Sequence, residues 1–124
     1  REAASETHAV LGAHPGLTGV MHYFSLGWDW AERFLDLGFH ISFSGLVTRP
    51  SRAELREVAR RCPPGRLLLE TDSPYGVPHR GRPPNRPALI TEVAASVAEA
   101  RGLSVQAVAE TATANARRLF GRIM

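Results

Sequence analysis

A run of three leucines that ends in two carboxylates, within the segment Leu67–Tyr75 (LLLETDSPY), constrains this chain more than any other feature. A continuous apolar run closed by a turn signal such as Pro74 predicts a strand buried on both faces, as in a parallel sheet. Carboxylates at the end of such a strand are costly unless they are paired or bind a cation. Because active sites of α/β proteins form at the carboxyl ends of parallel strands, Asp72 is the first candidate for a chemical role.

The other apolar patterns predict strands and helices that alternate along the chain. We expect strands at about 19–25, 39–44 and 66–71, and helices at about 2–11, 28–37, 51–62 and 87–101, followed by a short helix at 104–110 and a final helix that reaches residue 120. This order, with short connections, predicts right-handed crossovers and a parallel sheet. The fold class is therefore α/β, in one domain or part of one.

Polar residues at the element ends add local predictions. Ser51, with Glu54 three residues later, has the pattern of a capping box, and Ser104 is placed to cap the helix after it. The loop at 73–87 is rich in proline, glycine and arginine. Such a stretch could be a flexible linker, but because it directly follows the acidic end of a strand, a ligand-binding loop is an equally good interpretation.

Composition narrows the choice of partners and compartment. All 15 basic residues are arginine and the net charge is +3, which a phosphate-bearing partner and a GC-rich genome would each explain. Cys62 is the only cysteine, so a disulfide framework and a cysteine metal cluster are excluded. We expect Cys62 to be buried and the protein to be cytoplasmic. No apolar run approaches the roughly 18 residues of a membrane helix, and no membrane partner is expected.

His22 and Asp72 form a candidate metal site. His22 interrupts an apolar strand, and in a parallel sheet its side chain and that of Asp72 can converge at one end. Imidazole and carboxylate suit zinc, manganese or another divalent ion, which would activate a water molecule. Two ligands fall short of the usual zinc set, and a core histidine and a turn-capping aspartate are the ordinary alternatives. Glu70 would share the strand face of Asp72, either as a partner of the site or as a neutralised acid.

Five short motifs occur in order along the chain: GVMHYFS, DLGFHISFSG, LLLETDSPY, PHRG followed by NRP, and TANARRLFG. Together they resemble the C-terminal half of the TatD family of metal-dependent deoxyribonucleases, over about residues 1–121. The resemblance implies a (β/α)8 barrel, of which residues 1–124 form a single partial domain with three or so parallel strands, flanking helices and a helical C-terminus. It also implies DNA as substrate and a divalent cofactor, Mg, Mn or Zn. His22 and Asp72 would be metal ligands, and Asp72 would also act on the attacking water.

The resemblance has exceptions. Leu26 stands where the family usually has glycine, and Arg86 replaces an acidic residue of a loop motif. The family's paired histidines and a glutamate ligand have no counterpart here, and a further ligand histidine is expected just upstream of Arg1. A complete barrel needs about 250 residues. We therefore expect a fragment of the enzyme that is inactive in isolation.

Three functions remain open at this stage. The leading one is cleavage of phosphodiester bonds in DNA, with Arg80 and the backbone around Ser73 and Tyr75 as phosphate contacts. A related hydrolase could use the same water on an ester or amide, such as the aminoacyl link on tRNA. A degenerate half-barrel would act as a scaffold without catalysis.

Overall fold

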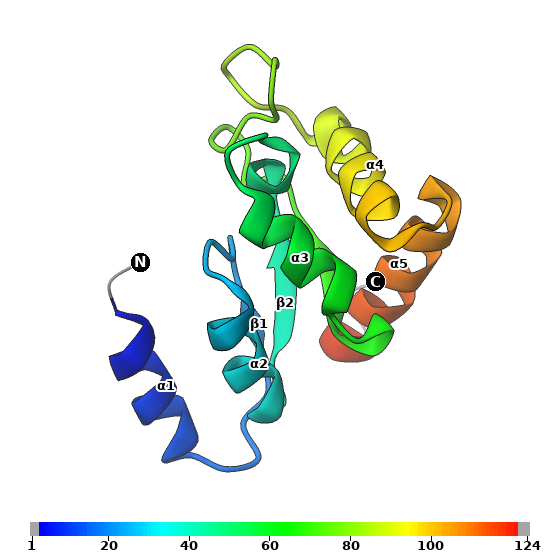
Figure 1. Ribbon diagram of the computed structural model, residues 1–124. Helices are drawn as coiled ribbons and strands as arrows, with labels where there is room; N and C mark the ends of the chain where they lie inside the picture. The colour runs from blue at the N-terminus through cyan, green and yellow to red at the C-terminus, as the bar shows by residue number, and fades with distance from the viewer. Residues whose placement is uncertain (1–2, 122–124) are drawn as a thin grey trace.

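A three-stranded parallel sheet, covered by helices, organises the computed structural model, which describes residues 3–121 (Figure 1). The main elements are α1 (Ala4–Gly12), β1 (Val20–Met21), α2 (Trp28–Asp36), β2 (His40–Phe43), α3 (Ala53–Arg61), β3 (Leu67–Leu69), α4 (Ile90–Arg101) and α5 (Val105–Phe120), with 3-10 turns at Gly45–Thr48, Pro64–Arg66 and Pro87–Leu89. The expected α/β class with parallel strands is confirmed. Among the described residues, none of the helices is long and apolar enough to cross a membrane.

Strand β2 lies between β1 and β3 and pairs in parallel with both. Val20 of β1 is level with His40, and Ile41 is level with Leu67 of β3. All four residues of β2 are buried, as expected for a strand with a neighbour on each side. This register brings the carboxyl ends of β1 and β3 to the same edge of the sheet.

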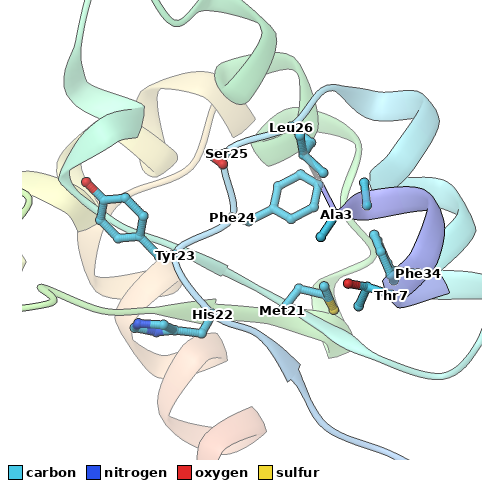
Figure 2. Close-up of a pocket in the computed structure, with 10 residues that line it drawn as sticks. Ala3, Thr7, Met21, His22, Tyr23, Phe24, Ser25, Leu26 and Phe34 are labelled. Carbon is cyan, nitrogen blue, oxygen red and sulfur yellow. The ribbon is translucent and has the colours of Figure 1, made fainter. Parts of the chain in front are cut away.

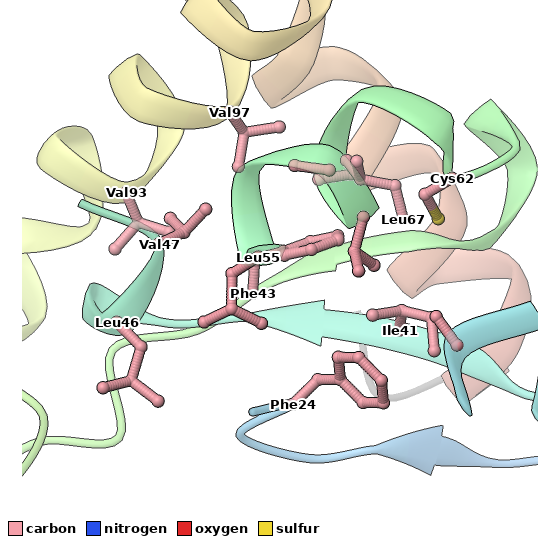
Figure 3. Close-up of a cluster of buried hydrophobic side chains, with 14 of the residues drawn as sticks. Phe24, Ile41, Phe43, Leu46, Val47, Leu55, Cys62, Leu67, Val93 and Val97 are labelled. Carbon is pink, nitrogen blue, oxygen red and sulfur yellow. The ribbon is translucent and has the colours of Figure 1, made fainter. Parts of the chain in front are cut away.

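The main core lies between the sheet and helices α3 and α4 (Figure 3). Side chains alternate along β2, so Ile41 and Phe43 share the face that packs in this core. Leu55 of α3 and Val93 and Val97 of α4 complete the same cluster, and each is at most 1% exposed. The helices thereby hold β2 in place from one side.

Cys62 is buried at the end of α3, as expected from the sequence. Burial raises the pKa of its thiol to about 12. A thiol that stays protonated at neutral pH is a poor nucleophile and metal ligand. Cys62 therefore contributes to packing, and the chemistry of the chain lies elsewhere.

Strand β1 is shorter than the predicted 19–25. Regular pairing stops at Met21 because the chain turns at Tyr23, where φ is 49°. The backbone N–H of Phe24 still donates to the carbonyl of Ser42 at 3.2 Å, so the chain stays beside the sheet after the turn. The sequence shows the apolar run but gives no sign of this turn.

Strand β3 also ends before the predicted limit of 66–71. Its last regular residue is Leu69, although the N–H of Glu70 continues the ladder to the carbonyl of Phe43 at 2.9 Å. Asp72 then adopts a left-handed conformation with φ 60°. The two carboxylates therefore lie in the turn after β3, beyond its regular part.

The predicted capping box at Ser51 is wrong. Helix α3 begins after Arg52, which has no side-chain capping hydrogen bond. Glu54 instead accepts a hydrogen bond from Nε of Arg52 at 2.7 Å, and the same guanidinium donates to the carbonyl of Ser25 at 2.8 Å. Glu54 therefore orients the side chain of Arg52, and Arg52 links the start of α3 to the segment after β1.

The C-terminal region is one long helix where two were predicted. Gly102 ends α4 in the left-handed conformation, at φ 67°, which glycine adopts without strain. The hydroxyl of Ser104 then accepts from the N–H of Ala107 at 3.1 Å, which confirms its predicted capping role. Helix α5 continues past the expected limit at 110 to Phe120, because no glycine or proline interrupts it.

The loop after β3 lies directly against the turn after β2. A Cβ atom added at Gly45 would overlap the carbonyl oxygen of Gly76 and lie 3.0 Å from the nitrogen of Pro78. The hydroxyl of Thr48 accepts from the N–H of His79 at 2.7 Å in the same contact. Glycine at position 45 is thus required by the close approach of two backbone segments.

Gly45→Ala is expected to lower the free energy of unfolding by about 1–3 kcal/mol, because neither backbone segment can move without breaking this contact. Urea unfolding followed by circular dichroism measures the change. Gly12→Ala at the end of α1 is the matched control, since its added methyl meets only a side-chain carbon of Leu37 at 3.9 Å. Equal destabilisation by the two substitutions would contradict this account of the contact.

His40 is a buried histidine at the start of β2. Its side chain is covered, with 8% of the residue exposed, and neither ring nitrogen has a hydrogen-bond partner within the described part of the chain. Burial, followed by the charges of Arg66 and Arg118, lowers the pKa of His40. The folded chain therefore favours the neutral imidazole.

Stability is expected to fall as the pH drops below about 6.5, the ordinary histidine value. As the pH falls, His40 takes up a proton in the unfolded chain before it does so in the folded chain. Its contribution to the free energy of unfolding is therefore complete above about pH 6.5 and is lost as the pH falls toward the lowered pKa of the folded chain. His40→Leu removes this titration and should flatten the dependence. The measurement is the urea midpoint at a series of pH values between about 7.5 and 5, and parallel curves for the two proteins would contradict it.

Candidate metal centre

Three side chains from two strands meet at the carboxyl edge of the sheet. His22 follows β1, whereas Glu70 and Asp72 follow β3. Nδ1 of His22 lies 2.9 Å from Oε1 and 3.1 Å from Oε2 of Glu70, and Nε2 lies 3.2 Å from Oδ1 of Asp72. One ligand atom from each of the three residues falls within 4.8 Å of the others. The structure thus brings together the two residues that the sequence singled out, with Glu70 beside them.

Glu70 is the most enclosed member of the three. Its side chain is 15% exposed, compared with 27% for Asp72 and 65% for His22. Oε2 accepts a hydrogen bond from the backbone N–H of Tyr23 at 3.0 Å. Oε1 is buried and, despite its short distance to the imidazole, has no partner with hydrogen-bond geometry. Of the two alternatives left open by the sequence, these contacts favour a partner of the site over a neutralised core acid.

Both turns that carry these residues contain a left-handed residue other than glycine. Tyr23 has φ 49° and Asp72 has φ 60°. Such conformations cost of order 1–3 kcal/mol each and persist where surrounding contacts impose them. Here the N–H of Tyr23 donates to Glu70, and the carbonyl of Asp72 accepts from the N–H of Tyr75 at 2.9 Å. Strain at both turns is typical of a functional site.

The donor set fits a divalent cation. One imidazole and two carboxylates lie close together here, and such groups offer nitrogen and anionic oxygen ligands. The buried oxygen of Glu70 without a hydrogen bond shows that the negative charge of this cluster is incompletely neutralised by protein groups. Imidazole in the set favours zinc or manganese over magnesium, which prefers oxygen ligands.

A pocket lies beside this cluster, between the segment after β1 and helix α1 (Figure 2). Met21, Phe24 and Phe34 line it. His22 and Tyr23 project to the other side of the chain in the same view. His22 thus lines the pocket at its edge, away from Met21 and Phe24, and its ring nitrogens contact Glu70 and Asp72.

The residues predicted to contact substrate are distributed along the loop after Asp72. The hydroxyl and the N–H of Ser73 both donate to the hydroxyl oxygen of Thr71, at 2.9 and 3.3 Å. Tyr75 is 72% exposed, and Arg80 is exposed in a left-handed conformation. Within residues 3–121, no hydrogen bond or ion pair joins Arg80 to the three clustered side chains. Ser73 and Tyr75 thus lie in the turn beside the site, and Arg80 lies farther along the loop.

Asn85 organises this loop, and the sequence analysis did not single it out. It is 4% exposed, and its amide group donates to the carbonyls of Thr71 and Tyr75, both at 2.7 Å. Its side-chain oxygen accepts from the N–H of Arg86 at 2.9 Å. The position of an asparagine directly after two prolines, in a loop motif already noted, was the available signal.

Comparison with known proteins agrees with this geometry. A family model described as TatD related DNase matches residues 1–121. The chain belongs to the TatD family. The family that the motifs resemble is thus confirmed over nearly the whole chain, and the cluster at the strand ends falls within the matched region.

Relatives of the chain within the TatD family include two bacterial proteins. YcfH of Escherichia coli strain K12, an uncharacterized metal-dependent hydrolase, is 44% identical over 124 residues, which cover 97% of this chain and 46% of YcfH. TatD of Klebsiella pneumoniae strain 342, a 3'-5' ssDNA/RNA exonuclease, is 40% identical over 108 residues, which cover 82% of this chain and 41% of that protein. The chain therefore spans a little under half the length of the relatives it matches.

A solved TatD structure supports the fold. The crystal structure of YjjV, a TatD homolog from Escherichia coli K12, matches with a TM-score of 0.90 and 33% identity, over 96% of this chain and 47% of YjjV. The expectation of a partial (β/α)8-type barrel, with three parallel strands and flanking helices, is confirmed.

His22→Ala is expected to weaken Zn²⁺ binding by this chain at least tenfold, because it removes the nitrogen ligand and leaves only carboxylate oxygen in the cluster. Isothermal titration calorimetry with Zn²⁺ measures the affinity. His14→Ala is the matched control, since His14 is exposed just after α1, where its ring contacts the carbonyl of Val10 at 2.9 Å. Unchanged affinity in His22→Ala would show that zinc binds elsewhere.

Proposed function

We propose that this chain supplies part of the active site of a divalent-metal-dependent hydrolase that cleaves phosphodiester bonds in DNA. The observation that carries the proposal is the meeting of His22 and Asp72 at the carboxyl ends of β1 and β3, with 3.2 Å between Nε2 and Oδ1. Membership of the TatD family supports a hydrolase, and the exonuclease name of the Klebsiella relative supports a nucleic acid substrate.

In this proposal His22 and Asp72 are metal ligands, and Asp72 is also the catalytic residue. A divalent ion bound there would polarise the phosphoryl oxygen and activate a water molecule. Asp72 has a second carboxylate oxygen beyond the one that faces His22, and this oxygen can orient the attacking water and accept its proton. Its side chain is 27% exposed, so it is reachable from solvent.

Substrate contacts are proposed on the loop after Asp72. The turn that holds Ser73 and Tyr75 offers backbone groups beside the site, and the exposed ring of Tyr75 is free to stack on a base. Arg80 and its exposed neighbours on the loop, Arg82 and Arg86, add positive charge that attracts a polynucleotide. Arg80 is the residue we assign to phosphate, by charge and loop position.

We also propose that residues 1–124 are one partial domain, the C-terminal half of a barrel, and that the rest of the barrel provides the missing ligands. The cluster has three side chains, and we take two of them as ligands. The matched relatives are about twice as long as this chain. The isolated chain would then be inactive. We propose Zn, Mn or Mg as the metal. We also propose a cytoplasmic location, because Cys62 is a free, buried thiol and no disulfide is formed with it.

The test is a chimera in which this chain replaces the matched region of Klebsiella TatD. We expect the chimera to degrade single-stranded DNA from the 3' end. Asp72→Ala in the chimera should lower kcat by roughly a hundredfold or more, because several kcal/mol of transition-state stabilisation depend on the metal and its water. Release of nucleotides from a 3'-labelled oligonucleotide, with Mn²⁺ or Mg²⁺ present, measures the rate.

Asp36→Ala, an exposed aspartate at the end of α2, is the control and should leave the rate unchanged. Retained turnover in Asp72→Ala would contradict the assignment of Asp72. Turnover of aminoacyl esters by the chimera, without cleavage of DNA, would favour the ester hydrolase over the nuclease.

A further inference from the structure

We propose that Glu70 is a positioning residue that holds the His22 ring with Nδ1 protonated, so that Nε2 is the nitrogen that binds the cation beside Asp72. The inference deepens the proposed metal site and depends on that site, but it does not depend on which bond the enzyme cleaves. It assigns to Glu70 a role distinct from that of a ligand.

The two nitrogens of the imidazole have different partners. Nδ1 faces the carboxylate of Glu70 at 2.9 and 3.1 Å, and Nε2 faces Asp72 at 3.2 Å. A neutral imidazole carries one N–H and has one free lone pair. Glu70 is the more enclosed carboxylate, so a hydrogen bond from the ring N–H stabilises Glu70 more than it would stabilise Asp72. The proton therefore belongs on Nδ1, and the lone pair of Nε2 faces Asp72.

Glu70 is itself fixed from two directions. Its backbone N–H donates to the carbonyl of Phe43, so its main chain continues the central ladder of the sheet. Its Oε2 accepts from the N–H of Tyr23, the residue next to His22. The same carboxylate thus binds both the ring of His22 and the backbone beside it, and both orient the imidazole.

The geometry of the ring separates Glu70 from the cation. The lone-pair directions of Nδ1 and Nε2 diverge across the five-membered ring, so a carboxylate bound to Nδ1 lies on the opposite side of the ring from a cation bound to Nε2. A cation held by Nε2 would therefore have Asp72 as its neighbouring carboxylate, while Glu70 stays bound to Nδ1. Carboxylates that accept from metal-binding histidines fix the tautomer in this way and raise metal affinity.

The test begins with the tautomer, which needs neither metal nor substrate. Long-range ¹⁵N–¹H correlation spectra of the histidine rings in this chain, under mildly alkaline conditions, should show Nδ1–H at His22. Titration with Zn²⁺ should then shift Nε2. In Glu70→Ala the ring should populate both tautomers, and zinc should bind between tenfold and a hundredfold more weakly.

Glu70→Gln keeps the volume and one acceptor oxygen for the N–H of Tyr23 but loses the negative charge that favours Nδ1–H, so its zinc affinity should fall between those of wild type and Glu70→Ala. Glu57→Gln, an exposed carboxylate on α3 that pairs with Arg60, is the matched control and should match wild type. An Nε2–H tautomer in the wild-type chain, or an unchanged tautomer and zinc affinity in Glu70→Ala, would overturn the proposal. A DNA-cleavage result on the chimera leaves these spectra unaffected, so failure of the proposed activity is a separate outcome.

Discussion

The parallel pairing of β2 with both of its neighbours is the constraint on which the site depends. His40 is level with Val20, and Phe43 is level with Leu69, so β1 and β3 finish at the same edge although nearly fifty residues separate them. A shift of one residue in either register would turn the side chains of that strand to the opposite face. The buried side of β2, held by α3 and α4, therefore fixes where the imidazole and carboxylates meet.

Strain and charge at this edge balance one another. The left-handed turn at Tyr23 directs an N–H toward Glu70, and Glu70 in turn contacts the ring of His22. Without the carboxylate the turn would lose the hydrogen bond that compensates its conformation. Without the turn the buried carboxylate would lose a donor. The strained backbone at Tyr23 and the negative charge of Glu70 therefore lie at the same edge of the sheet, where a bound cation would offset the charge.

Much of this arrangement could be predicted from residue types, and the rest depends on tertiary contacts. The apolar runs at β2 and β3, the cap at Ser104 and the meeting of His22 with a strand-end acid follow from local pattern and sheet topology. Both β1 and β3 were predicted to extend too far along the chain. The turn after β1 is stabilised by a hydrogen bond to the distant Glu70, and the turn after β3 by a local hydrogen bond between Asp72 and Tyr75. Ser51 failed as a cap for a similar reason, since Glu54 binds Arg52 instead. Asn85 shows its role only once the loop is folded around it.

The anchoring of the loop by Asn85 has a consequence for how such a site can diversify. Its amide ties the end of the loop at Asn85 to the carbonyls of Thr71 and Tyr75 at the beginning of the loop, whereas residues 79–84 between them are exposed. Insertions and changes in that tip would leave these hydrogen bonds and the metal edge in place. In the proposed function, the residues that would contact substrate and those that would hold the metal therefore lie in separable stretches of one loop, so selection could change the first without disturbing the second.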